Sequence, residues 1–140
     1  MENRELGIEA LENRLKPIFT LMGLKLFKRN IDFQVTEKHM PCLLIQEGED
    51  NIIKEVSRTY TGYPLIRSLD IIVEVWEMSS VKVKELRKEV ILHAFDGGPT
   101  LLQGVMFKES QTIGPFNQGI PGVLGMQVIF KMTYEDDTLK

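Results

Sequence analysis

The sequence predicts an α+β domain, with a mostly antiparallel sheet and two main helices packed on one face. Three observations lead to this fold class. Two segments place apolar residues at intervals of three and four, which is the period of a half-buried helix. Several other segments alternate apolar and polar residues, as half-buried strands do. Short turns rich in glycine and proline join the segments, which favours antiparallel neighbours within one domain that spans residues 1–140.

The first helix is expected over about residues 4–16. Pro17 lacks the backbone N–H that a helix needs and crowds the carbonyl of Asn13, so the helix should kink there or continue as a short second turn that ends near Gly23. One apolar stripe runs along this segment, formed by Ile8, Leu11, Leu15, Ile18, Phe19 and Met22.

The middle of the chain is expected to supply strands. The segment "GLKLFKRN" predicts a short half-exposed strand, and "PCLLIQEGED" predicts a strand of about five residues that gives way to acidic turn residues. The segments "NIIKEVSRTYTG" and "LIRSLDIIVEVWEM" predict a hairpin. In its second arm one face is apolar and the other is half polar, so Trp76 on the second face needs a cover other than the bulk core.

The clearest helix lies in "SSVKVKELRKEVILHAFDGG". Ser79 or Ser80 can cap its start, and Gly97, Gly98 and Pro99 end it. A strand over roughly residues 103–112 follows. The last segment, "LGMQVIFKMTYEDD", alternates so regularly that it predicts a strand with one buried face.

Composition excludes several classes of protein. The net charge is −3 and there is no basic run, so binding to a nucleic-acid duplex through many phosphate contacts is not expected. The start of the chain is charged from its second residue, unlike a signal peptide, and no apolar run is long enough for a membrane span. The one cysteine, Cys42, suits a reducing compartment, and we expect the chain to be made and folded in a cytoplasm.

The search for catalytic residues yields one weak candidate pair. His39 and Cys42 lie three residues apart and could serve as a base and a nucleophile in a small enzyme. Pro41 between them and the apolar strand that follows favour Cys42 as a small buried side chain instead. The other histidine, His93, falls late in a helix, where the helix dipole explains it.

No cofactor or metal site is expected from the sequence. No Cys, His, Asp and Glu cluster has the spacing of metal ligands. Two acidic groups, within residues 47–50 and 135–137, fall at expected strand ends, where charge keeps an edge or a tail solvated. "FDGGPT" follows a helix, so it lacks the context of a phosphate-binding loop.

The stretch "IGPFNQGIPGVLG", residues 113–125, is apolar although it is rich in glycine and proline. One interpretation is that it folds back over its own sheet. The other is that it meets a neighbouring copy of the chain. Burial of Phe116, Ile120, Val123 and Leu124 would contribute at most about 6–12 kcal/mol, against an association cost of about 4–15 kcal/mol, so edge strands or polar contacts would have to add to it. The residues expected at a subunit interface are Phe116, Ile120, Val123, Leu124 and Trp76.

As a pattern, nearly the whole chain resembles the tail terminator (tail-completion) proteins of tailed bacteriophages. The resemblance lies in the size, in the opening amphipathic helix that ends near "RLKPI", and in "PCLLIQEGED" followed by an acidic turn. It continues in a hairpin whose second arm, "RSLDIIVEVWEM", leads directly into a helix, and it ends with a strand, a loop and the closing strand "GMQVIFKMTY".

This resemblance implies a structural virion protein without enzymatic activity or cofactor. It implies a ring, hexameric in the family, at the head-proximal end of the tail, assembled in the host cytoplasm. The ring would stop growth of the tail tube and dock the head–tail connector or neck protein. DNA would pass through the lumen without specific binding, and no membrane would be involved.

Three alternatives remain open at this point. A head-closure or neck connector protein would form a ring with other partners. A small hydrolase or transferase would use His39 and Cys42. A monomeric ligand-binding module would line a pocket with Tyr60 and Trp76.

Overall fold

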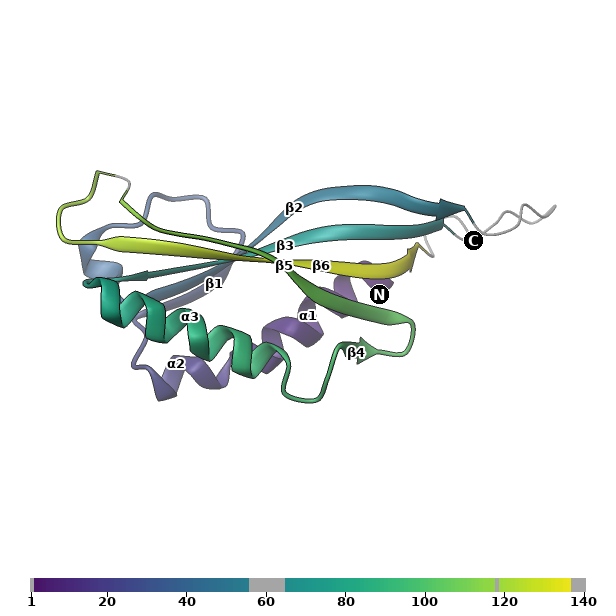
Figure 1. Ribbon diagram of the computed structural model, residues 1–140, viewed down its shortest axis with the longest axis horizontal. Helices are drawn as coiled ribbons and strands as arrows, with labels where there is room; N and C mark the ends of the chain where they lie inside the picture. Colours follow the sequence, from purple (N-terminus) through teal and green to yellow (C-terminus); the bar gives the residue numbers. More distant parts are fainter. Residues whose placement is uncertain (1, 56–64, 118, 137–140) are drawn as a thin grey trace.

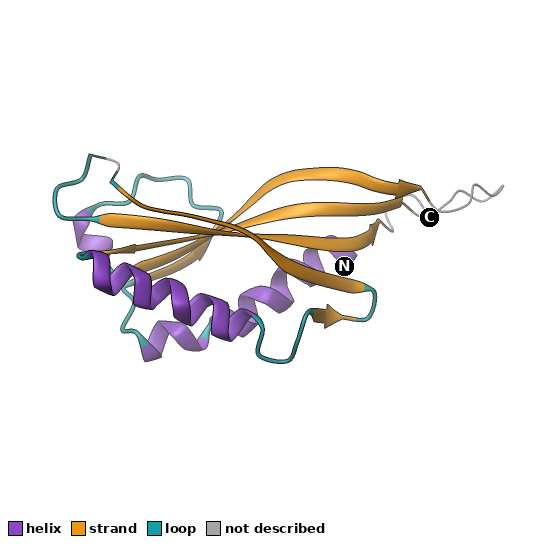
Figure 2. Ribbon diagram, in the orientation of Figure 1, coloured by secondary structure: helices purple, strands orange, loops and turns teal. Residues whose placement is uncertain are grey.

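The computed structural model describes residues 2–55, 65–117 and 119–136 and confirms the α+β fold class. Three helices cover one face of a six-stranded sheet (Figures 1 and 2). They are α1 (Asn3–Leu15), α2 (Pro17–Leu21) and α3 (Ser80–Ala94).

The sheet has the strand order β1-β2-β3-β6-β5-β4. All neighbours are antiparallel except β1 and β2, which are parallel. The three long central strands, β2, β3 and β6, extend past the helices at one end of the molecule (Figure 1). The strands are β1 (Leu26–Arg29), β2 (Cys42–Glu55), β3 (Leu65–Glu77), β4 (Thr100–Leu102), β5 (Val105–Phe116) and β6 (Leu124–Asp136).

The main core lies between the helices and the sheet. Alternate residues of β3 and β6 point to it, because successive side chains of a strand face opposite sides of the sheet. The stripes predicted for the first helix and for α3 supply the other half of this core. Its fully buried members from the two central strands are Leu69, Ile71, Val73, Val75, Val128, Phe130 and Met132.

The helices begin and end for the reasons expected from the sequence. α1 ends at Leu15, and Pro17 opens α2 at its first turn, where a missing N–H costs no hydrogen bond. α3 is capped by Ser79, whose hydroxyl accepts a hydrogen bond from the backbone N–H of Lys82 at 3.2 Å. Its predicted buried stripe is confirmed: Val83, Leu86, Val90 and Ala94.

The expected acidic turn at residues 46–50 is wrong. β2 runs through it as one strand of 14 residues, with a bulge between Glu47 and Asp50. The carboxylates do not break the strand because Arg4 of α1 binds both of them across the helix–sheet interface. The remainder of the expected hairpin arm, residues 56–64, lies outside the described residues.

The loop within the apolar stretch at residues 113–125 is shorter than expected. β5 continues to Phe116 and β6 begins at Leu124, which leaves only residues 117–123 between them. The pairing of β5 with β6 is irregular between Ile113 and Phe116, where Gly114 and Pro115 lie. Gly114 has a φ of 110°, a value that residues with a side chain rarely adopt. Two short elements were not expected: β4 and a 3₁₀ turn at Glu37–His39.

Two leucines of α3 test the placement of the core. Leu86 is fully buried, whereas Leu92 on the same helix is 55% exposed. Leu86→Ala should lower the free energy of unfolding by about 2–5 kcal/mol, because it removes buried methyl groups and leaves a cavity. Leu92→Ala should change it by less than about 0.5 kcal/mol. Urea denaturation followed by circular dichroism measures both, and equal losses would contradict the packing of α3 described above.

Candidate assembly surfaces

A second, smaller core lies on the face of the sheet opposite the helices. There the segments 30–41 and 119–123 fold over the end of the sheet where α3 begins (Figure 1). Its buried members are Met40, Cys42, Leu44, Trp76 and Val123. Leu26, Ile31, Val35, Phe116 and Ile120 pack around them and are partly buried.

This small core explains most of the apolar loop without a second copy of the chain. Phe116 packs edge-on against Trp76, with ring centroids 5.4 Å apart. Trp76 is only 1% exposed and Val123 is fully buried, so their own chain covers both side chains. Leu124 packs against the main core instead. Of the five residues expected at an interface, Phe116, Ile120 and Leu124 retain some exposed surface.

The polar end of Trp76 is satisfied inside the chain. Its indole N–H donates to Oε1 of Glu74 at 2.6 Å, and the amide of Gln127 donates to Oε2 of the same carboxylate at 2.8 Å. Glu74 is thus a buried carboxylate with two donors. The arrangement fixes the indole, and the cover that Trp76 needed comes from its own chain.

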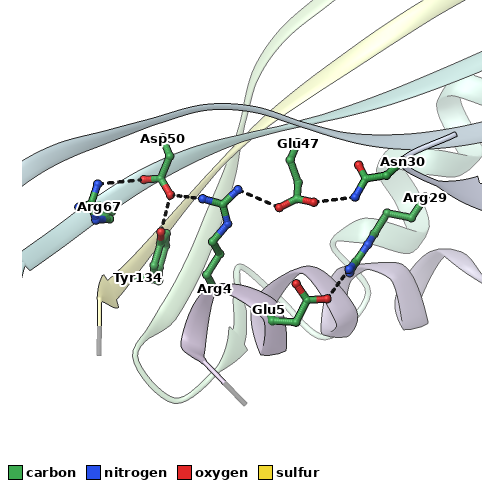
Figure 3. Close-up of polar contacts among 8 residues, drawn as sticks. All are labelled: Arg4, Glu5, Arg29, Asn30, Glu47, Asp50, Arg67 and Tyr134. Atoms are coloured by element: carbon green, nitrogen blue, oxygen red, sulfur yellow. Dashed lines mark hydrogen bonds and ion pairs between the residues drawn. The ribbon is translucent and has the colours of Figure 1, made fainter. Parts of the chain in front are cut away.

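A polar cluster joins α1 to the bulge of β2 (Figure 3). Arg4 donates to Asp50 Oδ2 at 2.6 Å and to Glu47 Oε1 at 2.8 Å. The Tyr134 hydroxyl also donates to Asp50, and Arg67 lies 3.8 Å from the other oxygen of that carboxylate. Burial, together with the bond to Asp50, raises the pKa of Tyr134. The cluster holds the long strands to the helix layer at the end where they leave it.

The same cluster continues toward β1. Asn30 donates to Glu47 Oε2 at 2.7 Å, and Arg29 pairs with Glu5 of α1. Although burial works against ionisation, the hydrogen bonds from Arg4 and Asn30 lower the pKa of Glu47. The residues that sequence reasoning missed here are Arg4 and Arg67, because each binds a carboxylate far away in the sequence.

The structure does not bring His39 and Cys42 together as a catalytic pair. The backbone N–H of Thr36 donates to Nδ1 of His39 at 2.9 Å, while the fully buried thiol of Cys42 contacts the Met40 sulfur at 4.0 Å. Tyr60, the other proposed pocket residue, lies outside the described residues, and Trp76 is buried in the small core. Within residues 2–55, 65–117 and 119–136 no group of three or more Cys, His, Asp and Glu side chains could hold a metal ion, and no helix has the length and apolarity to cross a membrane.

Open grooves lie on the surface of the described residues. One of about 740 Å³ lies beside β4, and its polar side chains include Lys108 and Lys131. Another of about 550 Å³ lies against residues 36–40, beside Lys25 and Met78. Among the residues that line the larger groove there is no histidine, cysteine or carboxylate that could act as base or nucleophile.

Both outer edges of the sheet are only half occupied. β1 pairs with Cys42–Ile45, and no described strand pairs with the outer side of β2 beyond Ile45. β4 pairs with Val105 and Met106, and no described strand pairs with the outer side of β5 from Lys108 to Phe116. Free edges expose backbone N–H and C=O groups that another chain can bind. Next to the free edge of β2, Ile52 and Ile53 are 52% and 56% exposed.

The acid stability of the fold tests the polar cluster. Glu47→Gln should lower the free energy of unfolding at neutral pH by about 1 kcal/mol, since the site is partly exposed. Because its pKa is lowered from the ordinary 4.5, Glu47 stabilises the fold above that pH and stops doing so as the pH falls through the folded-state value. Urea denaturation of both proteins should therefore show the difference disappear in acid. Glu85→Gln, on the exposed face of α3, is the control, and a difference independent of pH would contradict the role of Glu47.

The reactivity of Cys42 tests the enzyme alternative. Burial, with Glu74 and Glu77 nearby, raises the pKa of its thiol to about 12. Since the thiolate is the reactive form, iodoacetamide should label Cys42 at mildly alkaline pH only after the chain is unfolded in urea. Rapid labelling of the folded chain, measured by mass spectrometry, would restore Cys42 as a candidate nucleophile.

The fold has a counterpart among solved structures. No protein-family model and no curated protein sequence matches the chain. A chain in the virion of a native gene transfer agent (GTA) particle has a similar structure, with a TM-score of 0.52 over 91% of this chain and 92% of that chain. The two sequences are 14% identical, so the likeness shows a shared fold that extends over nearly the full length of both chains.

Proposed function

We propose that the chain is a structural protein of a virion, without enzymatic activity or cofactor. The observation that carries this proposal is the fold shared, over nearly its whole length, with a chain of a gene transfer agent virion. The half-occupied sheet edges support it, because they offer backbone groups to a neighbouring chain.

In its finer form, the proposal is that copies of the chain close into a ring, which is hexameric in the tail terminator family that the sequence resembles. The ring would end the tail tube at its head-proximal side and present a docking face to the head–tail connector or neck protein. A cyclic ring suits a chain with two different free edges, since each copy then uses both and no edge is left over. A net charge of −3 suits passage of DNA through a lumen that does not bind phosphates.

The exposed isoleucines of β2 test this function. We expect the recombinant chain to form an assembly of several 16.1 kDa subunits as its concentration rises, and antibodies to label one end of the tail on purified particles. Ile52→Asp combined with Ile53→Asp should weaken assembly by about tenfold or more, because burial of each side chain contributes about 1–2 kcal/mol. Native mass spectrometry measures the assembly, and circular dichroism checks the fold.

Val81→Asp provides the matched control. Val81 is more exposed than either isoleucine but lies at the start of α3, away from the sheet edges. Its substitution should leave assembly unchanged. A chain that stays monomeric at every concentration and is absent from purified particles would overturn the proposed function.

A further inference from the structure

The two edges of the sheet are complementary to each other in outline. On the β2 side, the short strand β1 occupies one end and leaves Gln46–Glu55 free. On the β5 side, the short strand β4 occupies the opposite end and leaves Lys108–Phe116 free. Each edge therefore has a projecting strand where the other has a vacancy.

The strand register shows that projections and vacancies lie at matching levels. The row through Leu26 of β1 crosses the sheet to Phe116 of β5, so β1 lies level with the free part of β5. In the same way, β4 lies level with the free part of β2, because the row through Asn51 of β2 reaches Met106, the partner of Thr100.

Strand direction also permits the two edges to join. β5 runs opposite to β2, since three antiparallel steps separate them in the sheet. A rotation about an axis along the strands preserves strand direction. In a head-to-tail ring of this kind, β5 of one copy therefore lies antiparallel to β1 and β2 of the next, which allows regular hydrogen bonding.

Between the short strands, one level of the sheet places the exposed Lys108 of β5 at one edge and the exposed Glu49 of β2 at the other. Lys108 pairs directly with Lys131, whose ammonium is neutralised by Asp70 at 3.1 Å. This row meets β2 at its bulge, where Gly48 and Glu49 are exposed. Because Asp70 is already bound to Lys131, an acidic group from a neighbouring copy can pair with the exposed Lys108.

Both edges are also irregular at this level. β2 has its bulge between Glu47 and Asp50, and β5 has a register shift between Glu109 and Gln111. Glu47 and Glu109 are in one row, through Ile71 and Phe130. Bulges disfavour pairing with an ordinary straight strand. An edge that is irregular at the same level is the better match, and the chain itself supplies one.

We infer that the two edges bind each other in an edge-to-edge joint between successive copies of the chain, in which the short strand of each edge pairs with the free part of the other. β1 of one copy lies along residues 111–116 of the next, β4 of that copy lies along residues 50–55 of the first, and Lys108 faces Glu49 between them. The inference rests on the proposed ring and adds the surfaces that would form it.

Disulfide cross-linking tests the joint. Two single variants, Glu49→Cys and Lys108→Cys, are mixed at a concentration that supports assembly and oxidised. The native Cys42 does not interfere because it is fully buried. The mixture should give a cross-linked dimer that neither variant gives alone. Glu85→Cys, exposed on α3, replaces either partner as the control and should give none.

The register is measured with a third variant. Asn51→Cys mixed with Lys108→Cys reports a stagger of two residues, which keeps every side chain on its face of the sheet and also supports the joint. Dimers formed by Glu49→Cys alone or Lys108→Cys alone would indicate a two-fold contact and would overturn it. An assembly of ring mass without cross-links above the control would overturn the joint but not the proposed function. Absence of any assembly would count against both.

Charge reversal gives a second measurement. Lys108→Glu should weaken assembly by about three- to tenfold, Glu49→Lys should do the same, and the two together should restore it. Lys108→Glu should leave the fold of the isolated chain intact, because Lys108 is an exposed residue of the edge strand β5. Weaker assembly explained by loss of folding, or no recovery in the double variant, would contradict the pairing.

Discussion

The pairing of β3 with β6 is the constraint on which the rest of the structure depends. The two strands are joined without interruption over thirteen residues each, whereas the pairings on either side of them contain register shifts. Because the ladder is regular, alternate side chains fall strictly on opposite faces. One face receives the helices and the main core, and the other receives the segments that cover Trp76. A shift of one residue would exchange these two sets and remove both cores at once.

The outer strands are positioned by less regular means. β2 pairs with β3 on both sides of a bulge, and Arg4 from the first turn of α1 binds the acidic residues of that bulge. A charge-assisted hydrogen bond to a partly buried carboxylate contributes more to the stability of a fold than an exposed ion pair does. The cluster can therefore hold in place a strand that leaves the helix layer. The same feature leaves the outer side of β2 unoccupied. The interaction that fixes this strand inside the molecule therefore also fixes the edge that we propose for assembly.

Local signals in the sequence were sufficient for much of the fold. The serine cap and the apolar stripe predicted α3, and the alternation in residues 124–136 predicted β6, because both patterns lie within a single element. The continuity of β2 could not be predicted, since its carboxylates depend on an arginine more than forty residues away. The interface predicted at Trp76 and Val123 stays a prediction, although both side chains are buried within their own chain. Apolar side chains must be covered, but their pattern does not say whether the same chain or another one covers them. Glu49 and Lys108 carry no local signal at all, and only the register places them at one level.

The irregularities of β2 and β5 have a geometric consequence. They flank the regular ladder at one level, near Phe130, and the strands twist strongly past one another at the middle of the sheet (Figure 1). Bulges bend a strand and increase its twist, so the level at which both strands are irregular gives the subunit an intrinsic curvature. The radius of any closed assembly would then be encoded in the backbone of each monomer before two monomers meet, and copy number would follow from shape more than from the strength of contact.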